Sequence, residues 1–221
     1  MKYAWDFHFV WGYWPLFVKG VSVSIGFCVV TIALGLIIGL FCRIGLLSRH
    51  RLLTFPIRGY VEAFRCTPLL VQIIWMYYAL PVIVNVDIPA TLAAGLALTC
   101  YISSFYAEIF RGGVVSIERG QWDAARALGM TRSQLMKRII LPQAIKRMVP
   151  SFMNQSVLQM KNTSLLSVIA VGDILYQGSA ITAATYRPLE VYTIAAIIYF
   201  VILYPSTVLA QRLEARLAVS D

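Results

Sequence analysis

Five stretches of this sequence are apolar over about 20 residues or more, the length that an α-helix needs to cross a bilayer. They run from about Phe17 to Phe41, Tyr60 to Val84, Thr91 to Phe110, Lys146 to Val171 and Leu189 to Ala210. Hydrophobic residues make up 59% of the chain and charged residues 13%, whereas soluble domains carry about 25% charged residues. The sequence therefore predicts an all-α integral membrane protein with five transmembrane helices, in a single domain covering residues 1–221.

The basic residues lie at alternate ends of these apolar stretches. Most of the 19 Lys and Arg fall in Arg43–Arg58, in Arg111–Arg147, or at Arg212 and Arg216. This distribution is typical of cytoplasmic loops. It places the N-terminus outside and the C-terminus in the cytoplasm. The net charge of +9 therefore indicates membrane orientation, and we expect no nucleic-acid partner.

Small side chains recur inside the predicted spans. Gly35 and Gly39 form a Gly-x-x-x-Gly pair, which would let another helix approach the first span closely. The four cysteines lie in or beside apolar stretches without a Cys-x-x-Cys pattern, so we expect small buried residues and no metal site.

A charged insert, residues 118–142, separates the third and fourth predicted spans. A first short helix is predicted over Gln121–Leu128, and Gly129 is well placed to end it in a left-handed conformation. Small residues at positions 124, 125 and 127 keep this helix thin. It could therefore enter a groove on another protein; the alternative is a solvated loop with a charged face.

The second half of the insert carries a helix-start signal. Thr131 precedes Gln134 by three residues, the spacing of a capping box. A second helix is predicted from Arg132 to about Leu141, where Pro142 would interrupt it. The insert is thus a predicted helix-turn-helix that lies outside the bilayer.

The fourth span is too polar to face lipid on all sides. Ser151, Gln155, Gln159 and Asn162 recur at intervals of four, four and three residues, so they share one helical face. Such a face should meet a water-filled path, a second subunit or the rest of the bundle. We predict a substrate path formed by Gln155, Gln159 and Asn162, with interhelical hydrogen bonding as the alternative.

Ionisable residues also occur within the predicted spans. Glu62 can pair with Arg65, and Glu108 with Arg111, because each pair is three residues apart on one helix. These pairs are either local ion pairs or a gate that connects to the insert. Lys161 is an isolated cation, for which we expect a structural acidic partner, with snorkelling or substrate contact as alternatives.

Ordered motifs along the chain resemble those of a known family. The pattern Asp123-Ala124-Ala125, Gly129, Ile139 and Leu141-Pro142 resembles the EAA loop of permease subunits of ABC importers, with Asp123 where the family usually has Glu. The segments FRCTPLLVQ (64–72), AEIFRGG (107–113), GQW (120–122) and KNTSL (161–165) resemble the polar amino-acid branch, with Cys66 in place of the usual Gly. The resemblance covers nearly the whole chain from about Gly20.

The resemblance implies a function and a set of partners. The first insert helix would be the coupling helix that docks on an ATPase subunit, through Asp123, Ala124, Ala125, Leu128 and Gly129. The chain would be the permease of a bacterial inner-membrane importer for a polar amino acid. Two ABC ATPase subunits, a second identical or homologous permease subunit, and a periplasmic or lipid-anchored solute-binding protein would complete it.

The chain itself lacks the residues for ATP chemistry. None of its 14 glycines is followed by Lys, so it has no phosphate-binding loop. ATP and Mg would be bound by the partner ATPase, and we expect no cofactor, no catalytic residue and no enzyme activity in this chain. Two other classes stay open: an ATPase-independent channel or secondary carrier for small polar solutes, and a membrane scaffold.

Overall fold

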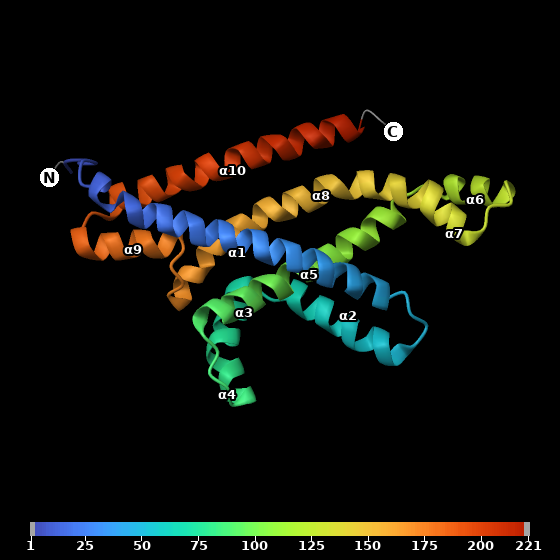
Figure 1. The fold of residues 1–221 in the computed structure, drawn as a ribbon, viewed down its shortest axis with the longest axis horizontal. Coiled ribbons are helices and arrows are strands. Elements are labelled where there is room, and N and C mark those ends of the chain that lie inside the picture. The colour runs from blue at the N-terminus through green and yellow to red at the C-terminus, as the bar shows by residue number, and fades with distance from the viewer. Residues whose placement is uncertain (1–2, 219–221) are drawn as a thin grey trace.

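The computed structural model describes residues 3–218 and shows an elongated bundle of helices (Figure 1). In chain order the elements are α1 (Val10–Gly45), α2 (Arg51–Cys66), α3 (Leu69–Ile74), the π-helical turn η1 (Trp75–Ala79), α4 (Leu80–Val84), α5 (Ala90–Val115), α6 (Arg119–Ala127), α7 (Arg132–Leu135), the π-helical turn η2 (Met136–Ile140), α8 (Leu141–Asn162), the 3-10 helix η3 (Thr163–Ile169), α9 (Ile174–Thr185) and α10 (Pro188–Ala218). Helices α6 and α7 project at one end of the bundle, whereas α9 lies near the N-terminus at the other end.

Three helices of the described part are long and apolar enough to cross a membrane: α1, α5 and the 188–216 part of α10. Two bent helix pairs could each form a further span, which would give up to five. One pair joins α2 to the segment Leu69–Val84 at an angle of 113°, and the other joins Arg132–Ile169 to α9 at 45°. The described part of the chain is thus all-helical, with several helices suited to span a membrane.

The stretch predicted as a span from Tyr60 to Val84 is not one continuous helix, because the chain breaks at Thr67 and Pro68. Thr67 is extended (φ −105°, ψ 142°), since the ring of a following proline disfavours the helical conformation. The side chain of Gln72 binds the freed backbone: its Nε2 donates to Phe64 O (2.9 Å) and Thr67 O (3.0 Å). Gln72 thereby fixes the sharp turn between α2 and α3.

The predicted helix end at Pro142 is wrong, since the helix runs on through η2 into α8. A π-helical turn ends two residues before this proline, and η1 ends two residues before Pro81 in the same way. A proline in a regular α-helix clashes with the carbonyl one turn earlier. The wider π turn gives the ring room, so the helix continues across each proline.

The close packing of α1 against α5 confirms the role predicted for Gly35 and Gly39. A Cβ atom at Gly39 would lie 2.8 Å from the backbone oxygen of Ser103, and one at Gly35 would lie 2.4 Å from Ile102 Cγ2. Ile102 and Leu98 are fully buried in this interface. The two glycines therefore let the helix axes approach to a distance that alanine would not permit.

A buried carboxylate at the start of α10 holds the N-terminal segment that precedes α1. Glu190 is fully buried. It accepts hydrogen bonds from the Tyr3 hydroxyl, from Asp6 N (3.2 Å) and from Arg187 Nη1 (3.0 Å). The hydrogen bond to Glu190 raises the pKa of the Tyr3 phenol. The segment before α1 is thus fastened to α10.

Candidate functional site

The turn between α6 and α7 has the conformation that its residues favour. Gly129 has φ +72°, in the left-handed region where a side chain would be strained. Thr131 then starts α7 with a complete capping box: Gln134 N donates to Thr131 Oγ1 (3.3 Å), and Thr131 N donates to Gln134 Oε1 (2.9 Å). The angle between the two helices is therefore fixed by local interactions.

The five residues predicted to contact an ATPase do not all face outward. Asp123, Ala124, Leu128 and Gly129 are exposed, and 81% of Leu128 is accessible. Ala125 is only 3% exposed, because it packs into an apolar cluster beneath α6. Ala125 therefore positions the helix, while the other four form a surface that we call the α6 surface.

The cluster beneath the α6 surface connects it to the membrane helices. It contains residues from the connection between α5 and α6, from α6 and from the continuous helix that follows: Ile117, Ala125, Leu135, Ile140, Ala144 and Met148. Ile109, Phe110 and Val114 of α5 pack against it. At Gly113 the helices α5 and α8 approach so closely that a Cβ atom would lie 2.1 Å from Met148 Cγ. Arg147 Nη1 also donates to the backbone oxygen of Ser116, at the end of α5. A displacement of α6 would consequently move α5 and α8 together.

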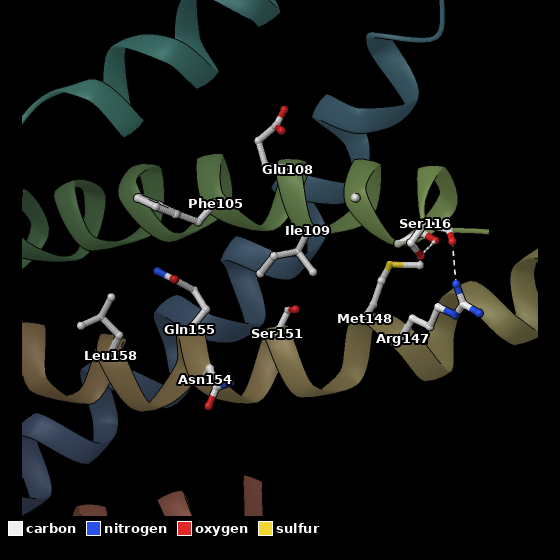
Figure 2. Close-up of a pocket in the computed structure, with 12 residues that line it drawn as sticks. Phe105, Glu108, Ile109, Ser116, Arg147, Met148, Ser151, Asn154, Gln155 and Leu158 are labelled. Carbon is white, nitrogen blue, oxygen red and sulfur yellow. Dashed lines mark hydrogen bonds between the residues drawn. The ribbon is translucent and has the colours of Figure 1, made fainter. Parts of the chain in front are cut away.

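A cavity of about 690 Å³ lies between α5 and α8, next to this connection (Figure 2). Ser151 and Gln155 point from α8 toward α5, and Asn154 and Glu108 also line the cavity. The Nε2 of Gln155 is buried without a hydrogen-bond partner among residues 3–218. A buried amide without a partner is costly, so this group is available to a ligand, a water molecule or another chain.

The other two residues of the predicted path differ in their surroundings. Gln159 is fully buried, and its Nε2 donates to Thr31 Oγ1 (3.0 Å) on α1 and to Leu98 O (3.2 Å) on α5. This is interhelical hydrogen bonding, the alternative considered for this face. The Nδ2 of Asn162 is buried, and the Asn162 side chain lies next to the hydroxyl of Tyr101 on α5. The polar face is therefore divided between the cavity and the bundle interior.

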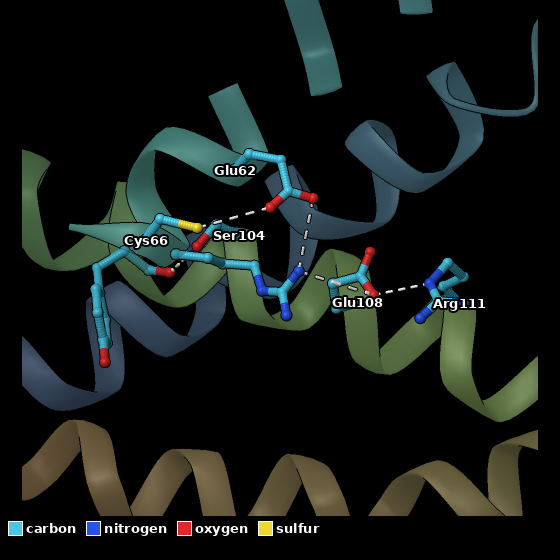
Figure 3. Close-up of polar contacts among 7 residues, drawn as sticks. Glu62, Cys66, Ser104, Glu108 and Arg111 are labelled. Carbon is cyan, nitrogen blue, oxygen red and sulfur yellow. Dashed lines mark hydrogen bonds and ion pairs between the residues drawn. The ribbon is translucent and has the colours of Figure 1, made fainter. Parts of the chain in front are cut away.

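The ionisable residues form a network between α2 and α5 (Figure 3). Glu62 lies 3.9 Å from Arg65, and Glu108 lies 2.7 Å from Arg111. Arg65 also approaches Glu108 at 3.9 Å, which links the two helices. Lys161, in contrast, is exposed and has no acidic partner within residues 3–218, so the structure gives it no structural ion pair.

Sequence reasoning missed Asn154 and the positioning role of Arg147. Asn154 follows Ser151 by three residues, which is a signal that it shares the cavity side of the helix. Arg147 lies near the start of the fourth predicted span, at the end of the basic cluster Arg111–Arg147, and the sequence assigns it no contact. Its contact with Ser116 joins positions 31 residues apart, and no sequence spacing predicts such a contact.

Comparison with known proteins identifies the family. Residues 11–219 match the family described as binding-protein-dependent transport system inner membrane component. The chain is 34% identical to the glutamine transport system permease protein GlnP of Escherichia coli, covering 99% of this chain and 100% of that protein. It is 32% identical to the arginine transport system permease protein ArtQ of Bacillus subtilis, covering 94% of each.

Comparison with solved structures supports the same family assignment. A structure described as an amino acid ABC transporter with histidines is 34% identical, covers 97% of this chain and 100% of that chain, and superimposes with a TM-score of 0.91. The MetNI methionine ABC transporter, at 20% identity and a TM-score of 0.72 over 91% of this chain and 96% of that one, shares the fold. This chain belongs to the family of binding-protein-dependent transport system inner membrane components.

Proposed function

We propose that this chain is the transmembrane permease subunit of an ATP-driven importer that carries a polar amino acid across the bacterial inner membrane. Family membership supports the permease role. The relatives named for glutamine and arginine transport support an amino acid as the substrate. The proposed topology has five spans, with the N-terminus outside. In it, α2–α4 form one bent span and α8–α9 form another.

The α6 surface is the proposed contact with a separate ATPase. The observation that carries this step is an exposed, rigid helix end, formed by Asp123, Leu128 and Gly129, on top of an apolar cluster shared with α5 and α8. Two ATPase subunits would bind ATP and Mg. Closing of that pair would push α6, and the connection through Met148 and Arg147 would pass the motion to the cavity.

The cavity between α5 and α8 is the proposed part of the substrate path. Gln155 presents a buried amide nitrogen without a partner among the described residues, and an amide can donate to a carboxylate or accept from an ammonium group. Asn162 is a proposed path residue by its place on the same face of α8. We assign Gln159 to interhelical bonding instead. A second permease subunit, identical or homologous, would close the open side, and a binding protein would deliver the amino acid from outside.

The Arg65–Glu108 contact is a proposed gate element for this path. Glu108 lines the cavity and also joins α5 to α2. A change in the position of α5 would lengthen this 3.9 Å contact first, because it is the only one of the network's ion pairs that connects two helices within the described residues.

The experiment that tests the function is ATP hydrolysis by the complete complex in lipid, measured with each polar amino acid and its binding protein. Gly129→Pro should assemble but lose the substrate response, because proline cannot adopt a φ of +72°. Gly120→Ala is the matched control, since a Cβ atom there meets nothing within 4 Å. The wild type should respond to one amino acid.

A different result would favour the alternative. If no ATPase associates with the chain and the purified chain alone passes a small polar solute, it is a channel or secondary carrier. If Gly129→Pro retains the full substrate response, the α6 surface is not the coupling contact.

A further inference from the structure

The connection between α1 and α2 exposes apolar and basic side chains side by side. We call residues Leu47–Arg58 the α1–α2 corner. Leu52 is 94% exposed and Phe55 is 83% exposed. Arg51 and Arg58 are also exposed and lie on the same side of α2 as Phe55, at helical spacings of four and three residues from it. Such a mixed surface is unusual for a region that only faces water.

The charge of the corner is not balanced by ion pairs with the described residues. No Asp or Glu occurs between Asp6 and Glu62. Arg49, Arg51 and Arg58 make no ion pair with any of residues 3–218, whereas Arg65, Arg111, Arg126 and Arg187 each lie within 4 Å of a carboxylate. The exposed arginines therefore attract an anionic partner from outside the chain.

The corner is fixed in place rather than a loose loop. A Cβ atom at Gly45 would lie 2.4 Å from Ile57 Cδ1, so the end of α1 contacts α2 directly. The amide of His50 donates to Ser48 Oγ (3.2 Å) within the turn. The exposed side chains are consequently presented by two helices whose relative position is set.

The corner also lies at the end of the bundle that the proposed orientation places at the cytoplasmic membrane surface. Figure 1 shows it at the same end of the molecule as α6 and α7, which reach farther along the long axis. It directly follows α1, a helix long and apolar enough to span the bilayer. Along the long axis, the corner lies between the span α1 and the far ends of the projecting helices α6 and α7. In the proposed orientation this position is the interface between lipid and water.

We propose that the α1–α2 corner binds anionic phospholipid of the cytoplasmic leaflet. The guanidinium groups of Arg49, Arg51 and Arg58 contact lipid phosphates, for which arginine geometry is well suited. Leu52 and Phe55 insert between the headgroups and the first carbons of the acyl chains. A lipid surface offers dense negative charge and hydrocarbon together, which is the complement of this corner. The proposal rests on the orientation given under the proposed function.

Photo-crosslinking identifies the occupant of the corner. Phe55→p-benzoylphenylalanine is introduced into the complete complex, in vesicles of phosphatidylethanolamine and phosphatidylglycerol in equal parts. Irradiation should give a lipid adduct. The matched control is Leu128→p-benzoylphenylalanine, which is similarly exposed (81% against 83%) but lies on the α6 surface and should give no lipid adduct. An adduct between position 55 and the ATPase or a second copy of this chain would overturn the proposal.

A charge variant tests the choice of lipid. Arg49→Gln, Arg51→Gln and Arg58→Gln together should lower the ratio of phosphatidylglycerol to phosphatidylethanolamine retained by the complex, measured by native mass spectrometry, by at least roughly fivefold. Arg119→Gln, Arg126→Gln and Arg132→Gln remove the same charge from α6 and α7 and should leave this ratio unchanged. An unchanged ratio in the corner variant contradicts the proposal.

The lipid inference and the proposed function fail separately. If lipid adducts form at position 55 but no amino acid stimulates ATP hydrolysis, the lipid site stands and the importer function is wrong. If the amino acid stimulates hydrolysis but position 55 crosslinks to protein, the importer function stands and the lipid site is wrong.

Discussion

Gln155 and Gln159 lie one helical turn apart on α8, yet replacing each with Met should have opposite consequences. Methionine is close to glutamine in size and shape, so each change removes an amide while leaving the volume nearly constant. Gln159→Met deletes two hydrogen bonds to neighbouring helices. Gln155→Met deletes an amide nitrogen that has no partner in the described part of the chain.

The sizes of the two effects follow from these contacts. Interhelical hydrogen bonds in membrane proteins contribute about 0.6 kcal/mol on average and up to about 1.7 kcal/mol each. Losing two of them should therefore lower the stability of Gln159→Met by about 1–3 kcal/mol. Removing an unpaired buried amide relieves a desolvation penalty, so Gln155→Met should be as stable as the wild type or slightly more stable.

The two variants should rank in the opposite order for transport, with Gln155→Met losing more activity than Gln159→Met. A hydrogen bond to a charged group contributes about 1.5–3 kcal/mol, so losing one from Gln155 to the substrate should lower substrate-stimulated ATP hydrolysis by about tenfold or more. The assay compares thermal unfolding of the detergent-solubilised complex with ATP hydrolysis in lipid, normalised to folded protein. Gln159→Met should unfold at lower temperature and retain the normalised rate.

Either of two results would refute the reasoning. If both variants lose equal stability, Gln155 has a structural partner and does not face the path. If Gln159→Met keeps wild-type stability but loses the substrate response, Gln159 belongs to the path and its two hydrogen bonds contribute little.

Three further predictions concern the packing, the turn and the ion pairs. Gly39→Ala should destabilise the complex by about 1–3 kcal/mol through a backbone clash, measured by thermal unfolding, whereas Gly26→Ala on the same helix meets nothing within 4 Å and should not. Thr131→Val removes a helix cap worth about 1 kcal/mol and should speed hydrogen exchange at the start of α7. Glu108→Gln should raise ATP hydrolysis without substrate, because it weakens the α2–α5 contact, while Glu62→Gln should change this rate less, as Glu62 lies on α2 and pairs only within that helix.

Several elements of the fold could be predicted because their causes are local. The Gly129 helix end and the Thr131–Gln134 capping box follow from residues within a few positions of each other, and both are present. The close approach at Gly35 and Gly39 was also predictable, since small residues spaced by four on an apolar helix favour packing. Sequence spacing did not reveal which helix would pack there.

Sequence reasoning did not anticipate how the chain behaves at two of its prolines. Pro68 and Pro142 carry the same local signal, yet the chain bends by 113° near Pro68 and the helix continues through Pro142. At Pro142 a π turn absorbs the ring, whereas at Pro68 the side chain of Gln72 binds the freed carbonyl groups. Both arrangements are local, but the presence of a proline alone does not indicate which of them forms.

The sequence by itself determined that this is a helical membrane protein with a charged, capped segment between apolar helices, because hydrophobicity and capping act over one or two turns. Only the tertiary structure decided whether each side of a helix faces the bundle interior, the cavity or the surface. Gln155 lines a cavity while Gln159 bonds to α1 and α5, and Ala125 is buried while Leu128 is exposed. Helical periodicity defines a shared face, but the neighbouring helices divide that face between interior, cavity and surface.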